Sequence, residues 1–303
     1  MESLIKIVYQ NGELAKNDST FLGVSFDTIF TVLTTLGIFI LGYIVNRQLE
    51  LRKEKRRLKE LEEYFIKLLE LLENPLVRQK DEFLAFSRRL KEKKEKHFEL
   101  INITPFQVDL IKEIDNKDLY TIFIKTKKGD TSRKTELFGK LRGQIEYFDV
   151  VKKTYKESFE NFVTRSEQYD RTYKEHIKIT SDFFDQMVSE SKSKGQNPAQ
   201  DIFLITLDNI RAKWVAYGVD GKVYQDRYVA REYYLLPSWE LCKTHILDPR
   251  AAFLTKHLLE CIYAFDNLEE LKRVYRRHFL IDARGLQKGL FDIKKVVKEF
   301  GTM

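Results

Sequence analysis

An uninterrupted apolar segment near the N-terminus constrains this sequence more than any other feature. Residues 28–45, called the anchor segment below, contain no charged residue and no proline, and two glycines are their only weak helix formers. About 18 residues at a rise of ~1.5 Å each match the hydrocarbon thickness of a membrane. A core helix of a soluble domain usually keeps a polar face, which this segment lacks. The sequence predicts one transmembrane helix, bounded by residues 22–46.

A dense basic segment at 47–59, called the basic flank, follows directly. Seven basic residues there accompany only Glu50 and Glu54. Such an excess is typical of the cytoplasmic side of a membrane helix. The pattern predicts a single-pass protein of the inner (cell) membrane, with a tail at 1–21 outside and the C-terminal region in the cytoplasm. The residues expected to contact anionic lipid headgroups are Arg47, Arg52, Lys53, Lys55, Arg56, Arg57 and Lys59.

The charge balance and the cysteines exclude several classes of function. The formal net charge is +7, but most of it lies in the basic flank, so nucleic acid is not an expected partner. Cys242 and Cys261 are the only cysteines and neither lies in a C-x-x-C pattern. We therefore expect two buried thiols rather than a disulfide or a zinc site. The sequence indicates no metal and no cofactor.

The composition favours an all-α fold, since only 13 glycines and five prolines occur and 33% of the residues are charged. The transmembrane helix is expected to continue into a cytosolic helical bundle that includes a long coiled-coil-like helix. The spacing of the apolar residues predicts that the first helix extends to about Glu73, where Asn74-Pro75 is expected to stop it. A second helix is then expected over 76–100.

A regular seven-residue register indicates one very long helix. No proline or glycine interrupts residues 144–194, and a helix of about fifty residues would reach roughly 75 Å. It is predicted either to stand as a stalk-like coiled coil or to bend within a bundle. The aromatic seam favours packing on the chain's own helices or in a larger oligomer over a plain parallel dimer. The register comprises Phe138, Leu141, Ile145, Phe148, Tyr155, Phe159, Phe162, Tyr169, Tyr173, His176, Phe183 and Met187.

The polar segment at 191–200, with Gly and Pro together, is the clearest linker. It is expected to separate a membrane-proximal helical region at 47–190 from a C-terminal helical domain at 201–303. Asp248 and Asn267 are predicted N-terminal caps in that domain. Its helices are expected at 199–217, 222–236, 249–265, 267–280 and 283–299.

Arginine precedes histidine at close spacing in three places. The pairs are Arg171 with His176, Arg250 with His257, and Arg273 with His278. This spacing resembles the R-x4-6-H motif of helical RNases of the HEPN type, in which histidine moves a proton and arginine stabilises phosphorane charge. The resemblance makes Arg273 with His278, and Arg250 with His257, candidate catalytic pairs. The competing interpretation is a half-buried seam histidine at 176 and solvated charged faces at 257 and 278.

An aromatic cluster at 228–240 is a candidate binding surface. Tyrosines and a tryptophan lie there beside two arginines, an arrangement suited to stacking on a base or a peptide. Aromatic residues at helical spacing more often form a core edge. The candidate binding residues are Arg227, Tyr228, Arg231, Tyr233 and Trp239.

The overall plan suggests a family. A short outer tail, one membrane helix, the charged helix NRQLELRKEKRRLKELEEYFIKLLELL and the late segment FDNLEELKRVYRRHFL resemble uncharacterised bacterial single-span membrane proteins and phage abortive-infection proteins. The resemblance implies a role in bacterial stress or anti-phage defence.

Three functions are compatible with these features. The first is a membrane-anchored, non-enzymatic helical protein that binds a partner or assembles with itself, which the regular seam favours. The second is an oligomeric effector that perturbs the membrane, with Asp27 at a pore mouth and threonines and glycines allowing close helix approach. The third is a HEPN-like RNase that uses the arginine and histidine pairs.

Overall fold

The computed structural model describes residues 20–21, 24–92, 107–127, 129–217 and 226–301. Nearly all of these residues are helical, which confirms the all-α prediction. Two short strands, β1 (Thr20–Phe21) and β2 (Val24–Ser25), pair antiparallel ahead of α1 (Phe26–Arg89). The chain divides into two compact units, Met1–Tyr64 and Phe65–Met303. The second unit is called the helical unit below.

In the first unit, α1 contains the anchor segment. It is the one helix of the described residues that is long and apolar enough to cross a membrane. The helix begins at Phe26 rather than at residue 22. The Thr31 hydroxyl donates to the Asp27 carbonyl at 2.7 Å, so this polar side chain is satisfied within its own helix.

Pro75 does not stop α1. The predicted break at Asn74-Pro75 and the separate helix over 76–100 are wrong, because α1 continues through Pro75 to Arg89; residues 93–106 lie outside the described residues. Burying one large apolar side chain contributes about 1.5–3 kcal/mol, and several such residues outweigh the ~3 kcal/mol cost of an interior proline. The buried stripe on both sides of the proline is Phe65, Leu68, Leu69, Leu72, Leu76, Phe83 and Phe86.

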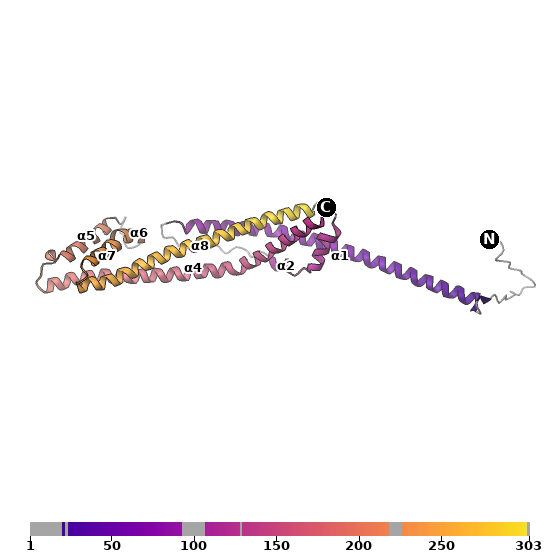
Figure 1. Ribbon diagram of the computed structural model, residues 1–303, viewed down its shortest axis with the longest axis horizontal. Helices are drawn as coiled ribbons and strands as arrows, with labels where there is room; N and C mark the ends of the chain where they lie inside the picture. The colour runs from indigo at the N-terminus through magenta and orange to yellow at the C-terminus, as the bar shows by residue number, and fades with distance from the viewer. Residues whose placement is uncertain (1–19, 22–23, 93–106, 128, 218–225, 302–303) are drawn as a thin grey trace, which may run out of the picture. The chain divides into compact units, whose positions relative to one another are not determined.

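The helical unit is built on two long antiparallel helices, α4 (Thr131–Ser193) and α8 (Pro249–Gly301), which lie side by side in Figure 1. The predicted long helix is therefore confirmed. It packs within a bundle of its own chain, and every residue of the seven-residue register is buried or half-buried. Phe86 of α1 contacts Phe162 of α4 and Phe279 of α8, at centroid distances of 5.6 and 5.0 Å. These rings join the three helices.

The prediction of three helices after residue 249 is wrong, because α8 is one helix. Asp248 does cap its start, accepting a hydrogen bond from the Arg250 N–H at 2.9 Å. Asn267 instead lies exposed inside the helix. Leu268 on its inner face is buried, as is Phe265 one turn before it. The inner stripe therefore stays in contact with the core across the expected break, and packing overrides the local cap signal.

Short helices cover the two ends of the α4 and α8 pair. Near the start of α4 lie α2 (Val108–Lys112), α3 (Asn116–Tyr120) and the π-helical turn η1 (Thr121–Thr126). Gly129, with a φ of 115°, and Asp130, the N-terminal cap of α4, directly precede the long helix. Near the other end lie η2 (Pro198–Gln200), α5 (Ile202–Ala216), α6 (Arg227–Ala230), the π-helical turn η5 (Arg231–Leu235) and α7 (Leu236–Thr244).

Two helix predictions in this region have different outcomes. The helix expected at 199–217 is confirmed from Ile202, where α5 begins, to its C-terminal cap Tyr217, whereas the extended backbone of Asp201 separates α5 from η2. The helix expected at 222–236 is helical from Arg227 onward in the described residues. It does not end at 236 but continues past Pro237 to Thr244. The wide turn η5 ends at Leu235, two residues before Pro237, and such a turn accommodates the missing proline N–H within a helix.

Candidate functional site

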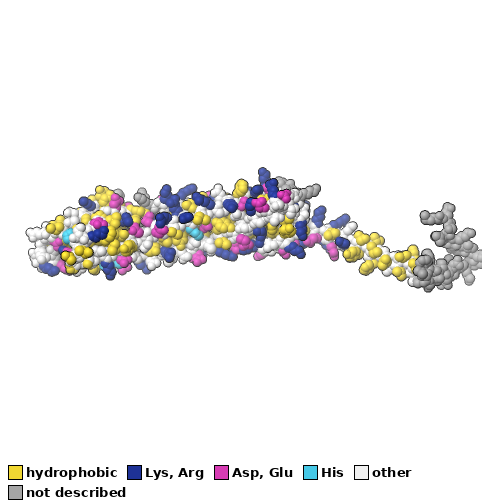
Figure 2. Space-filling model, viewed as in Figure 1, with side chains coloured by type: hydrophobic (Ala, Val, Ile, Leu, Met, Phe, Trp, Pro, Cys, Tyr) yellow, Lys and Arg dark blue, Asp and Glu magenta, His cyan; other side chains and the backbone are white. Residues whose placement is uncertain are grey.

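The anchor segment contains no buried residue, and all of its residues except Ile29 and Gly37 are exposed. Large apolar side chains point away from the protein along this part of α1: Phe39 is 74% exposed and Phe30 is 68% exposed. Figure 2 shows hydrophobic side chains, in yellow, gathered along the first part of α1. An apolar surface this long exceeds what a protein normally leaves in water. Such a surface is suited to contact with lipid or with other apolar helices.

The seven basic residues of the basic flank are all exposed on α1. Three of them pair with acids on the same helix: Arg56 with Glu60 at 2.9 Å, Arg57 with Glu54 at 2.8 Å and Lys59 with Glu63 at 3.9 Å. Exposed pairs of this kind are weak. The other four, Arg47, Arg52, Lys53 and Lys55, form no ion pair with the described residues, so their charges are available to an external anion.

The structure brings together two histidines that belong to different arginine–histidine pairs of the sequence, His176 and His257. The Nδ1 atoms of His176 on α4 and His257 on α8 are 2.8 Å apart, and the ring centroids are 5.0 Å apart. The solvated position expected for His257 is wrong, because this side chain is buried and packs on Phe253 with centroids 4.6 Å apart. Burial, with His176 and Lys256 nearby, lowers the pKa of His257. The contact joins histidine to histidine instead of histidine to arginine.

Arg273 and His278 have separate partners. Arg273 is ion-paired with Glu270, whereas Nε2 of the exposed His278 lies 3.4 Å from Oδ2 of Asp282. The Tyr147 hydroxyl contacts Oδ1 of Asp282 at 3.3 Å. Burial raises the pKa of Asp282. The carboxylate therefore orients the imidazole, and the arginine is engaged elsewhere.

A groove of about 460 Å³ lies along the same part of α8. Arg273 is one of its lining residues, and His278 is not among the described residues that line it. The groove therefore contains only one member of the candidate pair. Its described lining is Glu270, Arg273, Val274, Arg276, Arg277 and Leu280.

Arg250 connects the starts of two helices. Its guanidinium lies 2.6 Å from an oxygen of Asp201 and 2.7 Å from one of Asp248, and these two carboxylates cap α5 and α8. Hydrogen bonding from Arg250 lowers the pKa of Asp248. Burial opposes the same change in Asp201, but bonds from Arg250 and the Leu204 N–H still lower its pKa. The geometry assigns Arg250 a structural role.

Replacing Asp248 by alanine is expected to lower the free energy of unfolding by about 1–2 kcal/mol, because the cap of α8 and a partner of Arg250 are both lost. Asp248→Asn keeps the cap and should lose clearly less. Both Asp pKa values are lowered on folding, so the stabilisation is present above the ordinary value of 3.8 and is lost as the pH falls below it. Urea unfolding of the full chain in detergent, measured at neutral and acidic pH, checks this. Equal losses in the two variants would contradict the capping role.

The aromatic cluster forms the edge of a core. Tyr228, Tyr233 and Trp239 are partly buried against the core around Trp214. Tyr228 meets Phe265 edge-on, with centroids 5.1 Å apart. The two arginines of the cluster also have partners on the long helices, since Arg227 pairs with Asp170 and Arg231 with Asp266. These contacts explain the cluster by packing.

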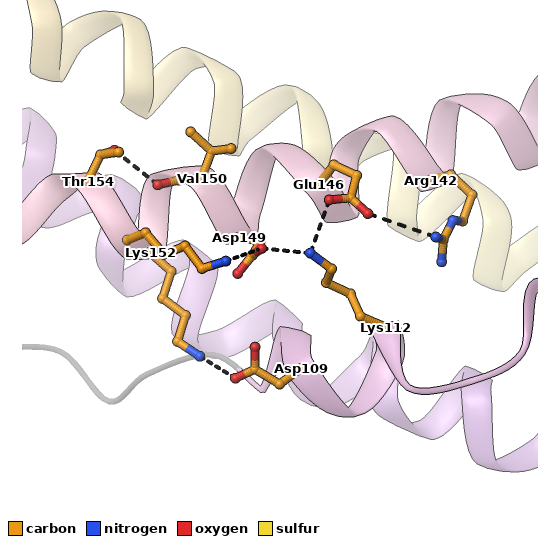
Figure 3. A network of polar contacts seen from close by, with 9 residues as sticks. Asp109, Lys112, Arg142, Glu146, Asp149, Val150, Lys152 and Thr154 are labelled. Carbon is orange, nitrogen blue, oxygen red and sulfur yellow. Dashed lines mark hydrogen bonds and ion pairs between the residues drawn. The ribbon is translucent and has the colours of Figure 1, made fainter.

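Sequence reasoning missed a network between α2 and α4, drawn in Figure 3. Lys112 of α2 donates to Asp149 at 2.7 Å and to Glu146 at 3.1 Å. Lys152 of α4 reaches back to Asp109 at 2.5 Å. Asp149 is buried, and hydrogen bonds from Lys112 and Lys153 lower its pKa. The sequence offered one signal for this network, the acid Asp149 directly after the seam residue Phe148. Its partner Lys112 could not be identified in advance, because α2 is distant from it in sequence.

Both cysteines lie in the core of the helical unit. Cys242 and Cys261 are buried free thiols, as expected, and burial raises their pKa values to about 11 and about 12. Among the described residues, no three or more His, Cys, Asp or Glu side chains are placed to hold a metal ion.

The chain was compared with protein-family models, with curated proteins and with solved structures. None of the three comparisons finds a match.

Proposed function

We propose that this chain is a single-pass protein of the cell membrane whose helical unit acts in the cytoplasm by binding a protein partner or a second copy of itself. The observation that carries the proposal is the anchor segment, in which no residue is buried, followed at once by the basic flank. Lipid would cover the apolar side chains, and anionic headgroups would meet the cations at the boundary.

Charge sets the proposed orientation. If the basic flank crossed the bilayer, each of its cations would have to pass through hydrocarbon. The free-energy cost would be roughly 2.5–3.5 kcal/mol for each cation at the helix centre. The segment before the anchor presents only Lys6 and Lys16 as basic residues. The N-terminal tail is therefore the part that crosses, and the helical unit stays in the cytoplasm.

A cysteine introduced at Ser19 is expected to react with an impermeant maleimide in intact spheroplasts, whereas one at Ser193 should react only after lysis. Both variants are made in a Cys242→Ser, Cys261→Ser background to remove the native thiols. Ser193 is exposed at the end of α4, so lack of labelling there would not come from burial. Labelling at residue 193 without lysis would overturn the orientation.

A small apolar surface supports the interaction role. Ile202, Ile246 and Leu247 are 73%, 79% and 96% exposed, and we call them the tip patch. Their segments lie together, because Phe203 packs on His245 with centroids 5.2 Å apart and Arg250 bridges to Asp201. Adjacent exposed aliphatic residues are more typical of an interaction surface than of a free one.

Replacing Leu247 by aspartate is expected to weaken self-association or partner capture by about tenfold or more, since a charge in an apolar contact must be desolvated. Mass photometry of the full chain in detergent, alone and after incubation with cell lysate, gives the readout. Phe291→Asp is the matched control, because Phe291 is also exposed, at 67%, but lies near the other end of α8. A wild-type chain that stays monomeric and captures nothing would remove the proposal.

A further inference from the structure

The contact between His176 and His257 lies inside a packed interface of α4 and α8. On one side, the Cys261 thiol approaches the Tyr173 carbonyl at 3.7 Å. On the other, Phe183 packs on Phe253 with ring centroids 4.2 Å apart. The two imidazoles are therefore held in contact by packed side chains before and after them along both helices.

Only some protonation states are compatible with this contact. A separation of 2.8 Å between the two Nδ1 atoms is a hydrogen-bond distance. One imidazole must carry its proton on Nδ1 and donate, and the other must keep a lone pair there and accept. A neutral pair meets this condition, and so does a pair in which one ring is an imidazolium. With both rings protonated, two N–H groups and two positive charges face each other.

We propose that His176 and His257 form a proton-operated latch between α4 and α8, closed while one facing nitrogen carries a proton and the other keeps its lone pair, and opened when both imidazoles are protonated. The opening is local, because the change affects one layer of the interface. This inference concerns the helical unit alone and does not rest on membrane insertion.

The charged groups around His257 act on its protonation in both directions. The groups acting on His257 are His176 and Glu175 from α4 and Lys256 and Glu260 from α8. Lys256 opposes protonation and the two glutamates favour it, so no single partner neutralises a second proton. Burial and His176 act in the same direction as Lys256 and lower the pKa of His257 below 6.5.

The sign of the pH effect follows from this lowered pKa. Below about pH 6.5 an unfolded or opened His257 binds a proton that the closed pair resists, so the closed state loses stability as the pH falls. Carboxylates with lowered pKa values, such as Asp201 and Asp248, stay ionised well into the acidic range. Asp282, with its raised pKa, acts in the opposite direction, because its protonation at lower pH relieves the cost of burying its charge.

Hydrogen–deuterium exchange of the full chain in detergent tests the latch at about pH 7.5 and about pH 5.0, with rates corrected for intrinsic exchange. In the wild type, protection of peptides covering 170–180 and 252–262 is expected to fall by about tenfold or more at the lower pH. In His176→Asn, His257→Asn, two amides can still hydrogen-bond without titrating, so protection should no longer depend on pH. His278→Asn, which removes an exposed histidine of the same helix, should respond like the wild type.

Equal wild-type protection of these peptides at the two pH values overturns the proposal without reference to any variant. An undiminished loss in the double variant also overturns it, because another group would then be responsible. If the double variant does not fold, His257→Gln alone replaces it, and a full wild-type pH response in that variant counts against the latch.

Discussion

Replacing Phe86 by alanine is expected to lower the free energy of unfolding of the helical unit by about 3–5 kcal/mol. The ring is fully buried and contacts Phe159, Phe162 and Phe279 at centroid distances of 5.4, 5.6 and 5.0 Å. It joins α1, after its proline, to both long helices. Truncation leaves a cavity where three elements meet, and the surrounding helices are too long to close around it easily.

Urea unfolding of the full chain in detergent, followed by circular dichroism, measures this loss. Phe291→Ala is the control, because its side chain is 67% exposed and should change stability by less than about 0.5 kcal/mol. Hydrogen exchange should also show the largest increase in residues 76–89, which depend on this contact to stay packed after Pro75. A loss below about 1 kcal/mol would mean that Phe86 is not central to the core.

Gly289→Ala is expected to destabilise the helical unit by about 1–3 kcal/mol, although alanine is intrinsically the better helix former by about 1 kcal/mol. A Cβ at this position would lie 2.3 Å from Cζ of Phe148 and 3.0 Å from Oε1 of Gln144. Phe148 is fully buried, so its ring has no free space to move into. The two long helices approach closely here because residue 289 has no side chain.

Gly143→Ala provides a control of opposite sign. Gly143 lies exposed in α4, and a Cβ there would meet nothing within 4 Å. This variant should gain about 0.5–1 kcal/mol from helix propensity alone. Combining Gly289→Ala with Phe148→Leu should recover part of the loss, since the smaller side chain relieves the overlap. If Gly289→Ala were as stabilising as Gly143→Ala, close packing of α4 and α8 at this level would be disproved.

The sequence by itself determined the features that depend on neighbouring residues. The absence of charge in the anchor segment and the absence of helix breakers in residues 144–194 were sufficient to predict the first part of α1 and most of α4, because helix formation follows local composition and spacing. Asp248 at the start of α8 was also readable, since a cap bonds to N–H groups two or three residues away. The seven-residue register identified the buried side of α4 without knowing its partner.

The tertiary structure alone decided where those helices continue and which side chains meet. Pro75 carries a local signal that stops a helix, and Asn267 carries one that starts a helix. Both residues lie inside helices, because buried stripes on either side keep the chain packed. His176 meets His257, and Lys112 meets Asp149, only because α4 packs against α8 and α2. Local signals are worth about 1–3 kcal/mol each, while a packed stripe sums many such contributions over residues distant in sequence.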